Sequence, residues 1–324
     1  MMDLGRLRAL HAVATHGSVG AAASVLGFTP SAVSQQIAKL ERETRTTLLE
    51  RRGRGVVLTD AAFGLAATAA QVLALVEEAE VTLEEQRGAA VGTLTIGAFA
   101  TAARGLLPVV LVDLIAHHPA LDVRTVELDP PDALEAVARG ELDLAVTHDW
   151  DNAPLAVPES LSRTTLGQDH ADVVLPLAHP LADRPFLVPE DLADQRWICQ
   201  PEGTICHDWL VKTFRGAGIE PDLAHRVGEY ETQLALLGRG IGVGLLPRLG
   251  RGALPPTVRA VPLHPTPTRR LFAMWRTKAS RRPAITATLA SLRGCWDQRS
   301  TASGEVGGNG VDHGGDQVRL VQAP

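Results

Sequence analysis

Residues 29–42 read TPSAVSQQIAKLER, and this stretch decides the fold of the first part of the chain. Thr29 is a good N-terminal cap for a helix, and Pro30 suits the first helical position because it has no N–H to leave unpaired. The apolar side chains that follow have the i, i+4, i+7 spacing of one buried helix face: Val33, Ile37 and Leu40. The stretch therefore predicts an amphipathic helix that packs on a core through one face.

The opposite face of this predicted helix is short, polar and cationic. A solvated helix face is also polar, but it usually carries long Glu and Lys side chains, whereas Ser and Gln stand near the start of this one. Hydroxyls and amides can bond to base edges in a DNA major groove, and cations can bind phosphate. We therefore predict a DNA-contacting surface made by Thr29, Pro30, Ser31, Ser34, Gln35, Lys39 and Arg42.

Two helices are expected before this one. Residues 3–16 carry leucines at helical spacing and are followed by Gly17, a residue type that often ends a helix. Ser18 can cap a second helix, and Gly27 supplies a sharp turn into the third. Three short helices joined by tight turns predict a helix-turn-helix.

A cationic hairpin is expected after the third helix. Residues 48–64 read LLERRGRGVVLTDAAFG, in which a glycine-rich turn with three arginines precedes a short apolar strand. Such a turn can contact phosphates or a minor groove, so Arg52 and Arg54 join the predicted DNA-binding residues. Residues 1–59 would then form a winged helix-turn-helix domain.

Charge is unevenly distributed along the chain, whose net charge is −6. Residues 1–59 have eight basic and four acidic side chains, residues 60–87 have one and six, and the remainder is acidic again. A basic end attracts phosphate and an acidic body repels it, so nucleic acid would be limited to one end. Ordinary scatter of surface charge is the alternative explanation.

Residues 4–65 resemble the DNA-binding end of LysR-type transcriptional regulators. The match lies in LRALHAVATHGSVGAAASVLGFTPSAVSQQIAKLERE and then LLERRGRGVVLTDAA, with the helix spacings, the turn glycine and the wing in the same order. Two residues depart from the family pattern, since Leu49 stands where Phe is frequent and Gln35 where Arg is frequent. Base contacts at Gln35 are therefore expected to differ from those of other members.

A long helix is expected over residues 60–88, where the chain has no proline. Apolar residues recur there at spacings of 4, 3, 4, 3 and 4, which is the seam of a coiled coil: Leu65, Ala69, Val72, Val76, Ala79 and Leu83. A helix packed on its own domain is the alternative. The resemblance implies a linker helix that pairs two subunits, with dimer contacts from Leu65, Val72, Val76 and Leu83.

The body, residues 89–297, alternates strand and helix and so predicts a parallel sheet covered by helices. Two segments repeat the order helix, turn, strand: AVARGELDLAV around Gly140 and LALLGRGIGVGLL around Gly240. The repetition suggests two similar α/β lobes. We expect lobe I over about 92–163 and 270–297, and lobe II over about 164–269.

The body also resembles the effector-binding half of the same family, through LLPVVL, HPLADRPFLVPEDLA and RRLFAMWR. The resemblance implies a periplasmic-binding-protein-like α/β fold with a small-molecule effector between the lobes. It carries over the following contacts: Ala100, Thr101, Thr147, His148, Pro201, Gly203, Thr204 and Tyr230. Helix N-termini at Thr101 and Thr204 would favour an anion, and Phe99, Trp150 and Tyr230 an aromatic portion.

Two other functions are weighed against this interpretation. A cysteine-based redox regulator of the same family would use Cys199 and Cys206, but two unpaired buried thiols are the simpler explanation. A solute-binding protein would have a similar body, but it would need export, and no signal peptide is recognised. We find no hydrolase, metalloprotease or nucleotide-binding motif and expect no enzyme activity, no cofactor and no metal site.

Further expectations follow from composition and from the family resemblance. The apolar charge-free runs at residues 61–76 and 88–103 have 16 residues each and are too short to span a membrane, so no membrane segment is predicted. Three cysteines fit a reducing cytoplasm. Residues 298–324 are rich in glycine and are expected to form a disordered tail. The resemblance implies three kinds of partner: promoter DNA, further copies of the chain in a dimer or tetramer, and RNA polymerase.

Overall fold

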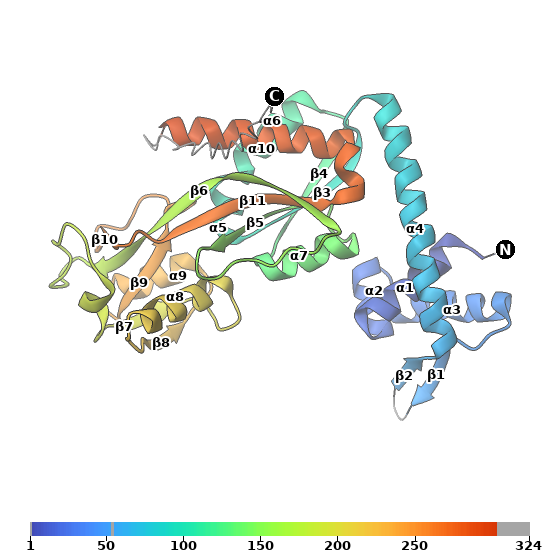
Figure 1. Cartoon of the computed structure of the whole chain (residues 1–324), viewed down its shortest axis with the longest axis horizontal. Coiled ribbons are helices and arrows are strands. Elements are labelled where there is room, and N and C mark those ends of the chain that lie inside the picture. The colour runs from blue at the N-terminus through green and yellow to red at the C-terminus, as the bar shows by residue number, and fades with distance from the viewer. Residues whose placement is uncertain (1, 53–54, 303–324) are drawn as a thin grey trace, which may run out of the picture.

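The computed structural model describes residues 2–52 and 55–302. A bundle of short helices with a small hairpin lies at one end, one long helix leads away from it, and a larger α/β body is built around a sheet (Figure 1). This arrangement agrees with the predicted winged helix-turn-helix, linker helix and α/β body.

The first domain folds as its apolar pattern predicts. It contains α1 (Leu4–His16), α2 (Val19–Leu26) and α3 (Pro30–Thr44). Asp3, Ser18 and Thr29 cap the three helices with their side chains, and Gly17 and Gly27 end the first two in the left-handed conformation. The centre of the core is fully buried and consists of Leu10, Ala22, Val33, Ile37, Leu40 and Leu48.

The hairpin has strands β1 (Leu49–Arg52) and β2 (Gly55–Leu58), which pair antiparallel. One carboxylate fixes it to the helices, because Glu41 Oε1 on α3 accepts hydrogen bonds from the backbone N–H groups of Leu48 at 2.7 Å and Leu49 at 3.0 Å. The orientation of the hairpin relative to α3 is therefore set by a side chain of α3 itself.

Helix α4 (Asp60–Arg87) starts at its cap Thr59 and packs along α1. Its first half belongs to the core of the first domain, since Ala62, Ala66 and Ala69 are buried there and Leu65 and Val72 pack against it. The predicted coiled-coil positions therefore do not all face solvent, because some of them pack on the first domain. The large apolar side chains that α4 leaves exposed are Phe63, Leu75 and Leu83.

The expectation of no membrane segment needs one qualification. Helix α4 is long and apolar enough to span a membrane by length and composition, with a mean hydropathy of 1.3 over its most apolar 18 residues. The expectation differed because it considered only stretches without any charged residue, and an apolar stretch with up to two charged residues can also be long enough. Part of its first half packs on α1 within the core of the first domain, while most of the apolar stretch is not buried in the described chain.

The body contains a nine-stranded sheet with the order β4-β3-β5-β11-β6-β9-β7-β8, and β10 also pairs with β6. Its strands are β3 (Gly92–Ala98), β4 (Leu121–Glu127), β5 (Leu144–Trp150), β6 (Leu161–Pro176), β7 (Arg196–Cys199), β8 (Asp222–Arg226), β9 (Val243–Pro247), β10 (Val258–Pro262) and β11 (Thr268–Arg276). The helices are α5 (Ala100–Gly105), α6 (Leu107–His117), α7 (Pro130–Arg139), α8 (Ile205–Gly216), α9 (Tyr230–Leu237) and α10 (Pro283–Ala302), with short turns η1 (Pro189–Leu192) and η2 (Thr277–Arg281).

The sheet is mixed, so the prediction of a parallel sheet is right only in part. Strands β3, β4 and β5 pair parallel, as do β7, β8 and β9. Between these groups lie β6 and β11, which pair antiparallel with each other, with β5 and with β9. The reason is that the chain crosses between the two groups on β6 and returns on β11, which must run in opposite directions.

Two other expectations needed correction. The helix predicted from Thr101 onward is broken at Leu106 into α5 and α6, because Pro108 has no N–H to continue the helical ladder. The predicted tail begins too early, since α10 continues to Ala302. The remaining tail, residues 303–324, lies outside the described residues.

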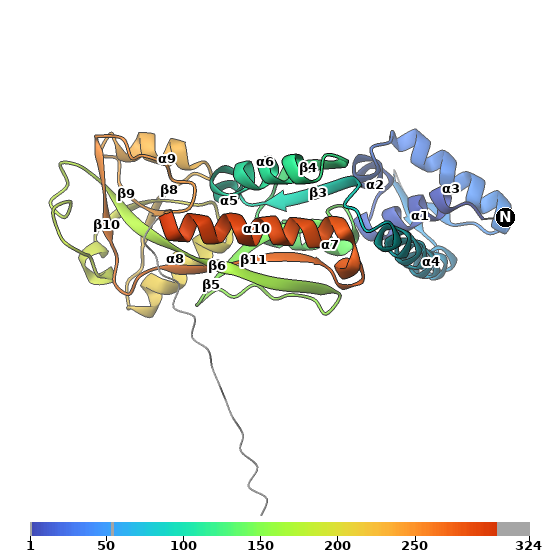
Figure 2. The same ribbon diagram turned by 90° about the horizontal axis from the view of Figure 1, so that it is seen from above.

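Helix α10 closes the body by lying along β6 and β11, beside α6 (Figure 2). Its Trp296 is 4% exposed and stands directly over Gly167 of β6. A methyl group at Gly167 would lie 2.0 Å from Trp296 Nε1, so this position requires glycine for close approach.

We predict that Gly167→Ala destabilises the chain by about 1–3 kcal/mol, because α10 must shift to relieve the clash. Gly294→Ala on α10 is the matched control: no atom of the described residues lies within 4 Å of the added methyl, and alanine favours a helix by up to about 1 kcal/mol. Urea unfolding followed by tryptophan fluorescence would measure both. Equal unfolding midpoints for the two variants would contradict the packing described.

Candidate functional site

The polar face of α3 is open to solvent while its apolar face is closed. Val33, Ile37 and Leu40 have no exposed surface. The side chains predicted to contact DNA are exposed on the described part of the helix and its cap: Thr29, Pro30, Ser31, Ser34, Gln35, Lys39 and Arg42. Thr29 Oγ1 accepts from the N–H of Ala32 at 3.2 Å, so the helix start is held in place.

The hairpin supplies the second part of this surface. Arg52 is the last residue of β1, opposite Gly55 of β2. Arg54 and the details of the turn lie outside the described residues. The hairpin strands follow α3 directly and are tied to it by Glu41, so α3 and the hairpin form one surface unit.

A buried ion pair lies where the two halves of the body meet. Arg269 on β11 and Asp169 on β6 are cross-strand neighbours, 1% and 2% exposed, with Nη2 and Oδ2 at 2.7 Å. Arg269 Nη2 also donates to Thr101 Oγ1 of α5 at 2.6 Å, and Asp169 Oδ1 accepts from Leu249 N at 2.9 Å. The pair therefore ties α5 to the segment that follows β9.

Aromatic rings continue from this pair into lobe II. Arg269 lies over the ring of Phe99, with 4.9 Å between Cζ and the ring centroid. Phe99 meets His148 edge to face at 4.5 Å, and Trp150 meets Trp209 at 4.8 Å. Burial, aided by the charge of Arg269, lowers the pKa of His148 well below its usual range, so this imidazole is neutral at pH 7.

Beside these rings is a small cavity of about 20 Å³. It is lined by Trp150, Ile198, Cys199, Gln200, Cys206, Leu210, Tyr230, Leu245 and Pro247. Burial raises the pKa of both thiols, Cys199 and Cys206, and raises that of the Tyr230 phenol well above its usual range. The groups around the cavity are thus uncharged at pH 7 and suit hydrogen bonding and apolar contact rather than nucleophilic attack.

The predicted effector contacts fall into two groups. Thr101, Thr147 and His148 are buried at this junction, and within the described residues Thr147 Oγ1 and His148 Nδ1 make no hydrogen bond. Ala100, Pro201, Thr204 and Tyr230 are half-buried, and Gly203 is exposed.

The expected helix N-termini are only partly as predicted. Thr204 caps α8, accepting from His207 N at 3.3 Å. Thr101 caps nothing, because α5 begins at Ala100 after Phe99, and the Thr101 hydroxyl is occupied by Arg269.

Sequence reasoning missed Arg269 and Asp169. They stand 100 positions apart, and only the antiparallel register of β6 and β11 brings them together. The available signal was the pair of arginines at positions 269 and 270, which directly precedes the apolar run LFAMW.

Two family models match the chain over most of its length. The model described as "Bacterial regulatory helix-turn-helix protein, lysR family" matches residues 4–63, and "LysR substrate binding domain" matches residues 87–296. The chain belongs to the LysR family. As a LysR regulator, it joins a DNA-binding domain for control of transcription to an effector-binding domain.

Relatives and solved structures agree with this assignment. This LysR chain is 32% identical over 302 residues to the probable hydrogen peroxide-inducible genes activator of Streptomyces viridosporus, covering 90% of this chain and 93% of the relative. It is 28% identical to IlvY of Escherichia coli strain K12 over 259 residues, covering 80% and 86%.

Full-length OxyR from Pseudomonas aeruginosa has a TM-score of 0.63 at 23% identity, covering 90% of this chain and 95% of that one. Full-length BenM has a TM-score of 0.57 at 24% identity, covering 94% and 99%. At this identity the likeness shows the fold.

A second ion cluster positions the segment after β9 over α5. Asp172 on β6, 4% exposed, accepts from Arg248 Nη2 at 2.8 Å and from Arg251 Nη1 at 2.8 Å. The segment then brings Gly250 against the carbonyl of Thr101, where a Cβ would lie 2.4 Å from the oxygen. The cluster therefore holds the lobe II side of the junction in place.

We predict that this cluster makes stability depend on pH. Burial raises the pKa of Asp172, but hydrogen bonds from Arg248 and Arg251 outweigh it and the net pKa is lowered. A depressed carboxyl pKa stabilises the fold above the unfolded pKa of about 3.9, and the contribution is lost as the pH falls through the folded pKa. Asp172→Asn should therefore destabilise the chain at pH 7, and by less below about pH 4.

Urea unfolding at both pH values would check this, with Asp183→Asn as control. The Asp183 side chain is 91% exposed, so that change should cost less than about 1 kcal/mol at pH 7. A cost of Asp172→Asn that is the same at both pH values would show that its charge is not involved.

Proposed function

We propose that this LysR regulator binds promoter DNA by placing α3 in a major groove and its hairpin on the flanking backbone. The observation that carries the proposal is the division of α3 into a fully buried apolar face and an exposed face of Ser, Gln, Lys and Arg side chains. Direct base contact is assigned to Ser31, Ser34 and Gln35, and phosphate contact to Lys39, Arg42, Arg52 and Arg54. We also propose a cytoplasmic location, because the genomic DNA that it would bind lies there.

The proposed effector is a small molecule at the lobe junction, with an aromatic or apolar portion. Support comes from the rings of Phe99, Trp150 and Tyr230 and from polar atoms of Thr147 and His148 that no described residue satisfies. The cavity of about 20 Å³ beside these rings has room for about one water molecule, so the junction must open to admit the effector. The anionic character expected from the sequence has less support, because Asp169 already neutralises Arg269. The effector that fits these side chains would carry a neutral polar group next to a flat apolar group.

We also propose that two chains pair through the exposed part of α4, and that pairs can associate further into tetramers. Leu75 and Leu83 are 65% and 55% exposed on the second half of α4, beyond the part that is packed on α1. A second copy of α4 is the expected occupant, because it offers the same apolar stripe with the same spacing. A dimer would present two α3 helices to the two halves of a pseudo-palindromic site, with RNA polymerase as a further partner.

A cysteine-based redox function has less support than effector binding. Thiol reactivity requires the thiolate, and burial raises the pKa of both Cys199 and Cys206. The cavity that they share with Trp150 and Tyr230 is lined by uncharged side chains. We therefore interpret the two thiols as part of the wall of the effector site.

The DNA-binding proposal predicts different effects for base and phosphate contacts. Gln35→Ala should lower the preference for a duplex from immediately upstream of the coding sequence over random DNA by about 5- to 100-fold, the usual worth of one good base contact. Arg52→Ala should weaken binding to both duplexes and reduce the salt slope by about 1. Fluorescence anisotropy over a salt series measures both quantities.

Gln36→Ala is the matched control, since the same change falls one position along on a half-buried side chain. It should leave the preference unchanged. Equal loss on both duplexes for Gln35→Ala would rule out base contact there, and failure of the wild type to bind any duplex at low salt would rule out the proposed function.

The dimer proposal predicts that Leu83→Arg weakens self-association at least about tenfold, because the new charge would be buried without a partner. Thr82→Arg adds the same charge one position away from the seam and should leave the dimer intact. Sedimentation equilibrium measures the dissociation constant. Equal constants for the two variants would mean that α4 does not pair through Leu83.

A further inference from the structure

Helix α7 begins near the lobe junction and ends near the DNA-binding domain (Figure 1). The N-cap residue of α7 is Asp129, which follows β4 in lobe I. The residue before it, Leu128, donates its N–H to the carbonyl oxygen of Ala98 at 3.0 Å, and Ala98 directly precedes Phe99 of the lobe junction. At its other end α7 closes at Gly140, whose φ is 78°.

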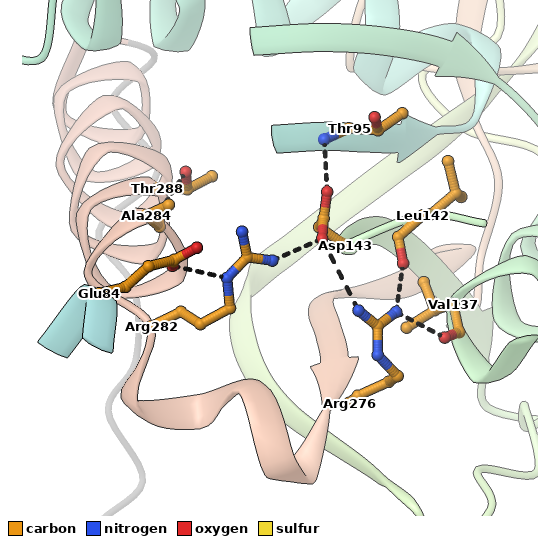
Figure 3. A network of polar contacts seen from close by, with 9 residues as sticks. All are labelled: Glu84, Thr95, Val137, Leu142, Asp143, Arg276, Arg282, Ala284 and Thr288. Atoms are coloured by element: carbon orange, nitrogen blue, oxygen red, sulfur yellow. Dashed lines mark hydrogen bonds and ion pairs between the residues drawn. The ribbon is translucent and has the colours of Figure 1, made fainter. Parts of the chain in front are cut away.

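The turn that follows α7, residues 140–143, contacts the linker helix through a chain of ion pairs (Figure 3). Asp143 Oδ1 accepts from Arg282 Nη1 at 2.6 Å, and Arg282 Nε donates to Glu84 Oε2 on α4 at 3.0 Å. The side chains of Arg282 and Asp143 are 12% and 20% exposed. These pairs are partly desolvated, so their energy is larger than that of exposed pairs and depends strongly on distance.

The same turn is fixed firmly to the body. Asp143 Oδ2 accepts from the N–H of Thr95 on β3 at 2.8 Å. Arg276 of β11 donates to the carbonyl oxygens of Leu142 at 2.7 Å and Val137 at 3.2 Å (Figure 3). Asp143 therefore moves together with α7, β3 and β11 as part of lobe I, and a movement of this unit reaches Asp143 without being absorbed in a loose loop.

A second contact joins this turn to the DNA-binding domain itself. Glu141 Oε1 lies 3.3 Å from Nε2 of His16, the last residue of α1. Between the first domain and the body is a groove of about 1070 Å³, lined by His16, Glu141, Glu84 and Arg282 among others. The two units thus meet here through polar contacts around a gap, which rearrange at lower cost than a packed apolar interface.

We propose that α7 and the turn at residues 140–143 couple the lobe junction to the DNA-binding domain of the same chain, through Glu141–His16 and Asp143–Arg282–Glu84. The proposal rests on the proposed function, because it requires that the first domain binds DNA. The turn is the branch point: one side chain contacts α1 and another, two positions on, contacts α4 through Arg282.

Helix α7 has the properties of a rigid connecting element. Ala133, Ala136 and Val137 are buried on one face, against Ala145 and Leu161. Ten residues of α-helix span about 15 Å and move as one body. A displacement that a ligand imposes at Asp129 therefore changes the positions of Glu141 and Asp143 relative to their partners.

Coupling between two sites is reciprocal, so it can be tested from the DNA end without a known effector. The probe is the upstream duplex used above, and the readout is hydrogen–deuterium exchange of backbone amides in residues 128–139. In the wild type, saturating duplex should change exchange there by about fivefold or more, the lower end of ordinary allosteric coupling. Glu84→Ala should abolish most of that change while duplex affinity stays within about twofold.

Glu85→Ala is the matched control. Glu85 is the next residue of α4 and has the same charge, but its contact with Arg281 is exposed and longer, at 3.6 Å. It should retain the wild-type response. Glu141→Gln tests the contact between Glu141 and His16. The charge that it removes is not buried, so the fold should be kept. The change of exchange in residues 128–139 should also be reduced.

The outcomes separate the two proposals. A wild type that binds duplex with no change of exchange in residues 128–139 would overturn the coupling alone. So would a Glu84→Ala variant that responds as Glu85→Ala does. A wild type that binds no duplex would overturn the proposed function.

Discussion

The buried ion pair between Arg269 and Asp169 is the contact on which the body of this protein depends. Both side chains are almost fully buried, and an ion left there without its partner would cost several kcal/mol. Their remaining hydrogen bonds go to Thr101 on one side and to Leu249 on the other. The need to satisfy both charges therefore fixes the two halves of the body against each other at the point where a ligand would enter.

The other elements of the fold transmit structural changes at the lobe junction to the DNA-binding domain. Strands β6 and β11 pass through both halves of the sheet, so the halves cannot separate without breaking strand pairing. Helix α7 leaves the junction and reaches the linker helix and α1 through part-buried charges. The DNA-binding domain has its own apolar core, which allows it to move as a unit when those polar contacts change.

Much of the fold follows from local pattern. Apolar spacing and caps are enough to predict α1, α2 and α3, because a helix is stabilised by contacts within a few residues along the chain. The strand order is not local. The antiparallel placement of β6 and β11 depends on pairing between segments about 100 residues apart, which no periodicity records.

The family, the order of the domains and the polar face of α3 can be read from the amino-acid sequence, since they depend on side-chain type and short-range spacing. Three features needed the folded chain: the Thr101 hydroxyl accepts from Arg269, Leu65 and Val72 pack on their own domain, and Asp143 connects Arg282 to the sheet. The physical reason is that burial and charge pairing are properties of the whole fold. A residue acquires them from partners that its neighbours along the chain do not specify.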